Sequence, residues 1–367
     1  MGKVMLKGLL AHKLRLVLTG LAIVLGVTFV SGTFVLTDTL HQTFTNLFST
    51  IYQHVDFVVR GEAVLSSNSP GGAPIRNPMP ASIATTVRRV PGVADTEGVV
   101  QGYAQYVAPD GKAIDNGGAP TLLVSFDPNS QMSSLHLVSG SAPVTADQVA
   151  MDQSTAQKYH FAVGDHVRVL LLGPTQTFVI SGIVRFGTAG NLAGATIAAF
   201  AQSTAQQLVG HPGQYYSVDV LAAPGANKAS LQRAIAGVLP PGVEVVTGQT
   251  VANETTNQIN QALGFFSTAL LIFAFIALFV GAFTIFNTFS ILVGQRTREL
   301  ALLRVVGASR RQIYWSVLAE AAVVGLVAAL IGLVLGVLTA LGLEALLKAF
   351  GITLPTSGLV FAPRTAI

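Results

Sequence analysis

Three long apolar runs divide the chain. Uncharged stretches extend for 22 residues over 16–37, 31 residues over 263–293 and 23 residues over 321–343. Each exceeds the roughly 20 residues that a helix needs to cross a bilayer. We therefore expect transmembrane helices over 16–37, 263–293 and 317–349. A cleaved signal peptide is the alternative for the first run, but that run is longer than a signal core of about 7 to 15 residues.

Helical patterning continues beyond two of these runs. After residue 37 apolar residues recur three and four positions apart, at Leu40, Phe44, Leu47, Phe48 and Ile51. This spacing places them on one face of a helix. The segment Gly248 to Phe266 contains no proline and leads without interruption into the second run. Two stalk helices are predicted, one at each end of the intervening domain.

The domain between the stalks has a different pattern. Short β-branched runs, "DFVVRG", "TLLVSF" and "GVEVVTG", predict strands, and "GDHVRVLLLGPTQTFVISGIV" predicts a hairpin turning at Gly173 and Pro174. Two helices, "SIATTVRRV" and "NKASLQRAIAGVL", should end before Pro91 and Pro240, because proline cannot continue a helix. Residues 38–262 are thus predicted to form an α+β domain of two subdomains.

Two smaller motifs lie within this domain. "SSNSPGGAPIRNPMP", over Ser66 to Pro80, is rich in Ser, Pro and Gly and predicts an exposed, mobile loop. The pentapeptide "QSTAQ" occurs at 153–157 and again at 202–206, each time after a strand-like run and at the start of a helix-like one. Repeated N-cap chemistry is favoured over duplication as its explanation.

Charge determines the expected topology. Only 10% of the 367 residues are charged, against about a quarter in a soluble domain. Four basic residues in segment 1–15 and five arginines within 294–316 flank the apolar runs. Basic flanks stay in the cytoplasm. Residues 38–263 then lie outside with net charge −4, while the remainder carries +8. Topology therefore explains the basic total, and nucleic-acid binding is not expected.

Motifs for catalysis are missing from the sequence. Gly111-Lys112 is followed by Ala113, so no Gly-Lys-Ser/Thr phosphate loop is present, and there is no His-Glu-x-x-His or Gly-x-Ser-x-Gly motif. With no cysteine in the chain, disulfides and thiolate metal sites are excluded. His160 and His166 are assigned to a surface turn in preference to a metal site. We expect no catalytic, cofactor or metal site.

The arginine-rich segment 296–315, "RTRELALLRVVGASRRQIYW", has its own local structure. "ELALLRVV" predicts a short helix, and Gly307 stands where a left-handed C-cap is wanted. Ser309 and Gln312 have the spacing of a capping box, so a new helix should begin there and become the third span. The arginines alone are explained equally well as a topology anchor.

The third span carries a ridge of small residues. They recur at spacings of four and three, at Ala321, Gly325, Ala329, Gly332, Gly336 and Ala340. Such ridges let helix backbones approach closely in lipid. We expect this ridge to pack against another helix, in the same chain or in a partner.

The arginine-rich segment, followed by "EAAVVGLVAALIGLVLG", resembles the C-terminal domain of FtsX/MacB-type ABC-transporter permeases. "LLAHKLRLVLTGLAIVLGVTFVSGTFVLTDTL" is similar to the amphipathic cytoplasmic segment and first span of that family, and "FAVGDHVRV" to a hairpin of its external domain. The resemblance implies a MacB-like periplasmic core and a coupling helix, within 294–316, that docks on a separate ATPase. It assigns the docking contacts to Glu299, Leu300, Leu303, Arg304, Gly307 and Ala308.

The resemblance also implies a function. The chain would be a non-catalytic permease subunit of a bacterial inner-membrane transporter, with its N-terminus in the cytoplasm. ATP hydrolysis in a partner would move the external domain, for export or extraction of lipid, lipoprotein or amphiphilic substrates. The implied partners are the ATPase, a second permease subunit or half, membrane lipids and an extracytoplasmic protein. The alternatives are an FtsX-like signalling subunit that activates a cell-wall hydrolase without transport and, least favoured, an anchored external enzyme.

The chain departs from the family pattern at its end. Residues 350–367, "GITLPTSGLVFAPRTAI" after Phe350, would form an external tail where the family has a fourth span. We therefore expect a fragment, a truncated product or half of a split permease.

Overall fold

The computed structural model describes residues 13–65, 72–114, 120–187, 194–295 and 309–349, and the single positions 297, 301, 305, 307 and 360. The described residues fall into two compact units. The helical unit draws on residues 1–40, 263–345 and 358–367, and the α+β unit draws on residues 41–262 and 346–357.

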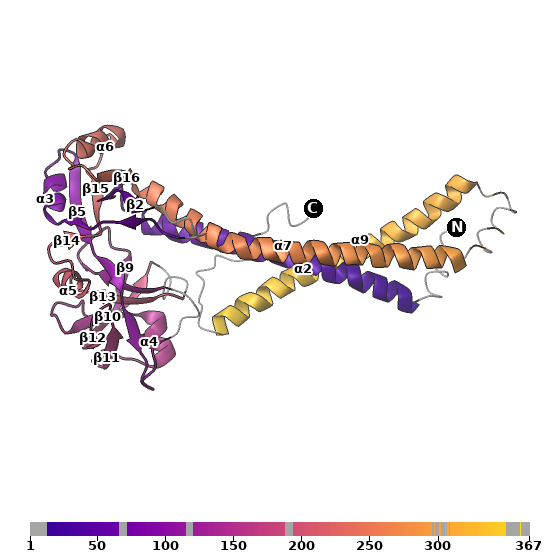
Figure 1. The fold of residues 1–367 in the computed structure, drawn as a ribbon, viewed down its shortest axis with the longest axis horizontal. Coiled ribbons are helices and arrows are strands. Elements are labelled where there is room, and N and C mark those ends of the chain that lie inside the picture. Colours follow the sequence, from indigo (N-terminus) through magenta and orange to yellow (C-terminus); the bar gives the residue numbers. More distant parts are fainter. Residues whose placement is uncertain are drawn as a thin grey trace. The chain divides into compact units, whose positions relative to one another are not determined.

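Three long helices are present, α2 (Lys13–Ile51), α7 (Gly248–Gln295) and α9 (Arg310–Ala349) (Figure 1). No proline interrupts any of them. The predicted continuation of the first apolar helix to Ile51 is confirmed, as is the unbroken course of the second from Gly248. Each of α2 and α7 supplies residues to both units.

Two stretches among the described residues are long and apolar enough to cross a membrane, Gly20–Ile51 and Ala321–Leu346. Within α7 the corresponding apolar run is shorter, Leu271–Asn287. Large side chains on that run are exposed, with Phe275 at 68% and Phe279 at 74%. Contiguous apolar surface of this kind requires lipid or protein cover. Three spans remain a prediction.

One sheet of the α+β unit has four antiparallel strands in the order β16-β1-β15-β5. Their bounds are β1 (Phe57–Gly61), β5 (Val93–Val99), β15 (Ser217–Ala222) and β16 (Val243–Thr247). Helices α3 (Ser82–Arg88) and α6 (Lys228–Ala236) pack on one face, over Val59 and Val218. The opposite face, which bears Val58, packs against Val55 just after α2 and Val251 in the first turn of α7.

A second sheet of eight strands follows the order β6-β8-β13-β10-β12-β11-β7, with β9 also paired to β12. The bounds are β6 (Gln101–Tyr103), β7 (Gln105–Val107), β8 (Thr121–Ser125), β9 (Leu135–Gly140), β10 (Gln148–Asp152), β11 (His166–Leu170), β12 (Gln176–Phe186) and β13 (Thr196–Phe200). Helices α4 (Gln153–Tyr159) and α5 (Gln202–Leu208) pack against it. Its main core contains Tyr106, Phe178 and Phe200. Four short strands, β2 (Ala63–Leu65), β3 (Ile75–Arg76), β4 (Met79–Pro80) and β14 (Gln214–Tyr215), complete the unit.

Most local predictions for this unit are confirmed. The three β-branched runs are β1, β8 and β16, and the predicted hairpin is the antiparallel pair β11–β12. The two helices predicted before Pro91 and Pro240 are α3 and α6. Two sheets with separate cores agree with the expected α+β domain of two subdomains.

Two predictions were wrong in part. Residues 66–71 of the predicted loop lie outside the described residues, but its second half forms β3 and β4. Met79 is buried in the core there, which opposes the mobility expected from composition. The two "QSTAQ" helices do not share N-cap chemistry. Asp152 caps α4 by accepting a hydrogen bond from the Thr155 amide (2.8 Å), whereas Ala201 precedes α5 without a side-chain cap.

Candidate functional site

The glycines of α9 bring it into backbone contact with α2 inside the helical unit. A Cβ on Gly332 would lie 2.7 Å from the Val27 Cβ, and a Cβ on Gly336 would overlap the Ser31 hydroxyl. The Thr28 hydroxyl donates a hydrogen bond to the Gly332 carbonyl (3.1 Å). Only glycine permits this approach, which is how small residues promote association in lipid.

The predicted ridge residues differ in their surroundings. Gly332, Gly336 and Ala340 are buried, and Ala328 continues this line toward the N-terminus of α9 at a spacing of four. Ala329, next to that line, is half-buried, and no atom lies within 4 Å of a Cβ built on Gly325. The structure thus brings Gly332 and Gly336 to α2 and leaves Gly325 apart from the contact.

The start of α9 has the predicted capping box. The Ser309 amide donates to Gln312 Oε1 (2.9 Å), the Gln312 amide donates to Ser309 Oγ (3.2 Å), and α9 begins at Arg310. Gly307 has φ +102°, a conformation that favours glycine. The other docking residues, Glu299, Leu300, Leu303, Arg304 and Ala308, lie outside the described residues. Their role remains a prediction.

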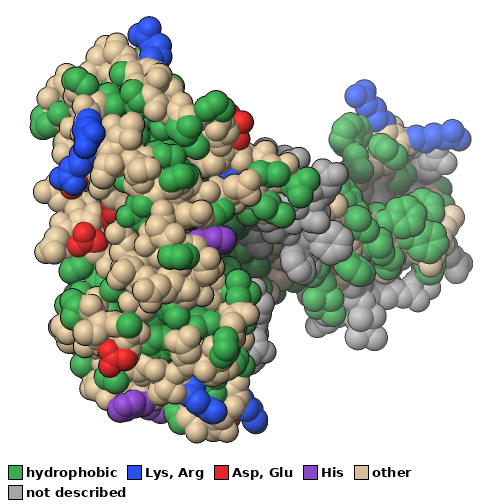
Figure 2. All heavy atoms as spheres, turned by 60° about the vertical axis from the view of Figure 1, so that its left-hand side comes forward, with side chains coloured by type: hydrophobic (Ala, Val, Ile, Leu, Met, Phe, Trp, Pro, Cys, Tyr) green, Lys and Arg blue, Asp and Glu red, His purple; other side chains and the backbone are tan. Residues whose placement is uncertain are grey.

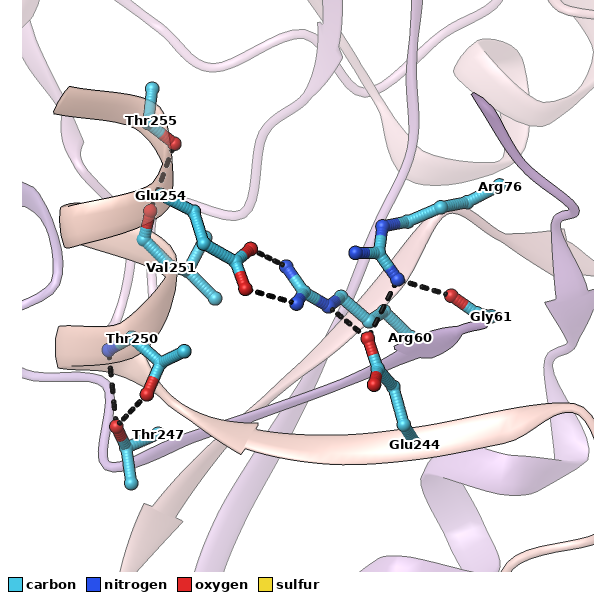
Figure 3. A network of polar contacts seen from close by, with 9 residues as sticks. All are labelled: Arg60, Gly61, Arg76, Glu244, Thr247, Thr250, Val251, Glu254 and Thr255. Carbon is cyan, nitrogen blue, oxygen red and sulfur yellow. Dashed lines mark hydrogen bonds and ion pairs between the residues drawn. The ribbon is translucent and has the colours of Figure 1, made fainter. Parts of the chain in front are cut away.

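A partly buried ion-pair network joins the first turns of α7 to the four-stranded sheet (Figure 3). Arg60 on β1 donates two hydrogen bonds to the Glu254 carboxylate of α7, at 2.7 and 2.9 Å. Its Nε donates to Glu244 on β16 at 2.9 Å. A bidentate guanidinium–carboxylate pair holds both distance and orientation. The Arg60–Glu254 ion pair, here called the clamp, therefore fastens the sheet to α7.

A second arginine completes the network. Arg76 Nη1 donates to Glu244 at 2.7 Å and to the Gly61 carbonyl at 2.8 Å. The side chains of Arg60 and Arg76 are only 9% and 8% exposed. Two arginines and two glutamates balance in charge, which buried ions require. The hydrogen bonds from Arg60 lower the pKa of Glu254, so the clamp is ionised at neutral pH.

The start of α7 is also fastened to the chain that follows α2. The Thr247 hydroxyl accepts a hydrogen bond from the Thr250 amide (3.1 Å), as an N-cap does. The Gly248 amide donates to the Asp56 carbonyl (3.1 Å), and a Cβ on Gly248 would overlap the Val55 carbonyl. The end of α2 and the start of α7 therefore meet at the end of the β1–β16 pair where Phe57 faces Thr247.

The sequence predictions missed this network. One signal was available, because Arg60 stands in a buried apolar strand, "FVVRG", where an unpaired charge would be costly. Its partners could not be chosen from the sequence. On the face of the α+β unit drawn in Figure 2, the charged side chains are few and scattered.

The described residues hold no candidate metal site. No group of three or more His, Asp or Glu side chains there could hold a metal ion. His160 has a positive φ of 58° and is the left-handed C-cap of α4. His160 thus lies in a turn because it ends α4.

The two units together define a class of protein. One unit is a folded α+β domain with its own cores, and the other consists of apolar helices whose large side chains face outward. This combination is that of a membrane protein with a large domain outside the bilayer. The sequence matches the MacB-like periplasmic core domain over residues 16–238 and the FtsX-like permease C-terminal family over residues 271–363. The chain belongs to the FtsX/MacB-type family of ABC transporter permeases.

Two permeases are related in sequence. An ABC transporter permease protein of Mycobacterium tuberculosis is 32% identical over 199 residues, which are 54% of this chain and 22% of that protein. An ABC transporter permease of Methanocaldococcus jannaschii is 28% identical over 148 residues, 40% of this chain and 37% of that protein. The chain thus spans less than two fifths of either relative's length.

Two solved structures resemble parts of this chain. The periplasmic region of MacB from Actinobacillus actinomycetemcomitans is 11% identical with a TM-score of 0.41, covering 55% of this chain and 94% of that one. The extracellular domain of the transporter YknZ from Gram-positive bacteria is 12% identical with a TM-score of 0.37, covering 52% and 98%.

Proposed function

We propose that this permease subunit transmits movement driven by ATP hydrolysis in a separate ATPase subunit to its extracytoplasmic domain. The transmitted movement would export or extract lipid, lipoprotein or amphiphilic substrates. A second permease subunit or half would complete the membrane part, and the N-terminus would lie in the cytoplasm. The observation that carries this proposal is the Arg60–Glu254 clamp, since it fixes the four-stranded sheet to a helix that continues unbroken to Gln295.

Transmission of this kind needs a stiff element that is fixed at each end to the part that moves with it. A hydrogen-bonded helix resists stretching, so a displacement at one end of α7 reaches the other end. The bidentate pair at Glu254 and the close contact at Gly248 prevent α7 from sliding on the sheet. At the cytoplasmic side, the segment around Glu299 and Leu303 would receive the movement from the ATPase.

Docking and transmission can be tested separately with the full chain and the ATPase encoded beside it, reconstituted in lipid. Glu299→Lys and Leu303→Asp should abolish ATPase capture. Glu254→Ala should leave capture intact but lower substrate-stimulated ATP turnover at least tenfold, because α7 is released from the sheet. Asn253→Ala, at the neighbouring exposed position of α7, is the matched control and should behave as wild type. Full coupling in the Glu254→Ala protein would refute the clamp's role.

A further inference from the structure

A cavity lies inside the α+β unit beside the clamp. Its volume is about 400 Å³, within the range of small-molecule sites. The walls come from the end of α2, the early turns of α7, strands β5, β6 and β8, and the segment 132–135. Both of the helices that continue into the helical unit therefore contribute to one cavity.

Most of the wall is apolar. Much of its lining comes from Phe48 of α2, Tyr52 just after α2, Leu122 of β8, Ile259 of α7 and the loop residue Met132. Apolar surface that water must wet is costly, and an aliphatic or aromatic ligand would relieve that cost. An apolar body on the ligand is therefore favoured.

Two carboxylates face this cavity from neighbouring strands. Glu97 on β5 and Asp219 on β15 stand directly opposite each other in the antiparallel register, and both line the cavity. Like charges in this arrangement repel. Glu97 accepts a hydrogen bond from the Ser130 hydroxyl. Within the described part of the chain, the Asp219 carboxylate has neither a hydrogen bond nor an ion pair.

No basic side chain lines the cavity. The titratable groups that act on Asp219 are Glu97 from β5 and Tyr52, which follows the end of α2. Arg60 on β1 lies on the same side of the sheet as Asp219, but it is engaged by Glu244 and Glu254. If both carboxylates were ionised, no cation in the lining would therefore compensate their charge.

We propose that this cavity binds a small cationic amphiphile, with its ammonium group between Glu97 and Asp219 and its apolar body along Leu122 and Ile259. The titration of the pair agrees with this assignment. Burial, with Glu97 nearby, raises the pKa of Asp219 to about 8. Burial also raises the pKa of Glu97. An ammonium would replace the proton that Asp219 otherwise retains near neutral pH. The assignment of this ligand as transported cargo rests on the proposed function, whereas binding itself does not.

The test uses the full chain in lipid discs and octylamine as the probe, measured by equilibrium dialysis with empty discs subtracted. Octanol and octanoate have the same chain without the positive charge. At pH 8 octylamine should bind saturably, one per chain, and at least tenfold more tightly than either. Asp219→Asn should weaken octylamine binding at least tenfold. Ile259→Gln should also weaken octylamine binding, because it removes apolar contact with the alkyl chain. Asp110→Asn, at an exposed loop carboxylate, should match wild type.

The pH dependence gives a second readout. An alkylammonium stays charged up to pH 10 or so, as lysine does. Because it must displace a proton from Asp219, affinity should rise at least tenfold between pH 6 and pH 8 in wild type and stay flat in Asp219→Asn. Equal binding by wild type and Asp219→Asn, or equal binding of octanoate, would overturn the site. Displacement by dihexanoyl phosphatidylethanolamine would assign the ammonium to a lipid head group, and its failure would assign it to a free amine.

Failure of the site and failure of the coupling function give different results. Binding needs no ATPase, so an intact site in a chain that captures no ATPase would refute only the proposed coupling. Binding that leaves the ATP turnover of the assembled complex unchanged would support the site and refute its assignment to cargo.

Discussion

The two units of this chain are held together by different kinds of packing. The α+β unit buries Phe57, Phe178 and Phe200 in closed cores and pairs its buried arginine Arg60 with glutamates. The helical unit leaves large residues such as Phe279 exposed and joins α2 to α9 through glycines. Burial from water drives the first arrangement. In lipid that drive between helices is lost, so close backbone approach takes its place.

The largest expected effect on the free energy of unfolding comes from removing the paired charge of the α+β unit. Arg60→Met removes a buried cation and leaves the carboxylates of Glu254 and Glu244 without it. Because these carboxylates are 39% and 35% exposed, the free energy of unfolding should fall by about 3 to 4 kcal/mol, the lower part of the range for a buried pair. Arg88→Met is the matched control, because its pair with Asp95 is exposed and should be worth less than about 1 kcal/mol. Thermal unfolding of both variants in lipid discs measures the difference. Similar losses would show that burial does not set the strength of the clamp.

A smaller effect is expected on the helical side. Gly336→Leu forces a side chain into the space of Ser31 and should cost about 3 kcal/mol, near the upper end of overpacking. Gly325→Leu adds the same side chain to the same helix in open space. It should therefore unfold like wild type, or slightly later because leucine is the better helix former. Separation of α2 from α9 can be followed by disulfide trapping between cysteines introduced along the contact. Equal disruption by both variants would contradict the packing shown by the glycines.

The smallest expected effect is the pH dependence of stability at Asp219, a carboxylate without a cation partner among the described residues of the α+β unit. The folded pKa of Asp219, about 8, lies above its unfolded value of about 3.9. The stability that protonated Asp219 gives the folded state is therefore fully present below about pH 4 and is lost as the pH rises toward 8. After allowance for water reaching the partly exposed carboxylate, Asp219→Asn should raise the free energy of unfolding by roughly 2 kcal/mol at pH 8. At pH 4 it should leave stability nearly unchanged. A gain of equal size at both pH values would exclude titration as its cause.

Local patterns made much of the fold predictable. Apolar spacing predicted the continuation of α2, the absence of proline predicted the unbroken course of α7, the serine–glutamine spacing predicted the cap of α9, and β-branched runs predicted β1, β8 and β16. Each of these depends on residues close together in the chain. The loop over Ser66 to Pro80 shows where composition fails. Its second half is ordered by Met79 in a core and by Arg76 on Glu244, which is 168 residues away.

The sequence by itself determined the class of this protein, its long helices, the α+β character of its domain and its family, because these follow from periodicity, charge distribution and contiguous motifs. Only the tertiary structure decided which groups meet. Arg60 finds Glu254 across 194 residues, and Asp219 faces Glu97 through the pairing of β15 with β5. Such contacts depend on strand register and helix crossing, which are set by the packing of the whole chain and not by any segment alone.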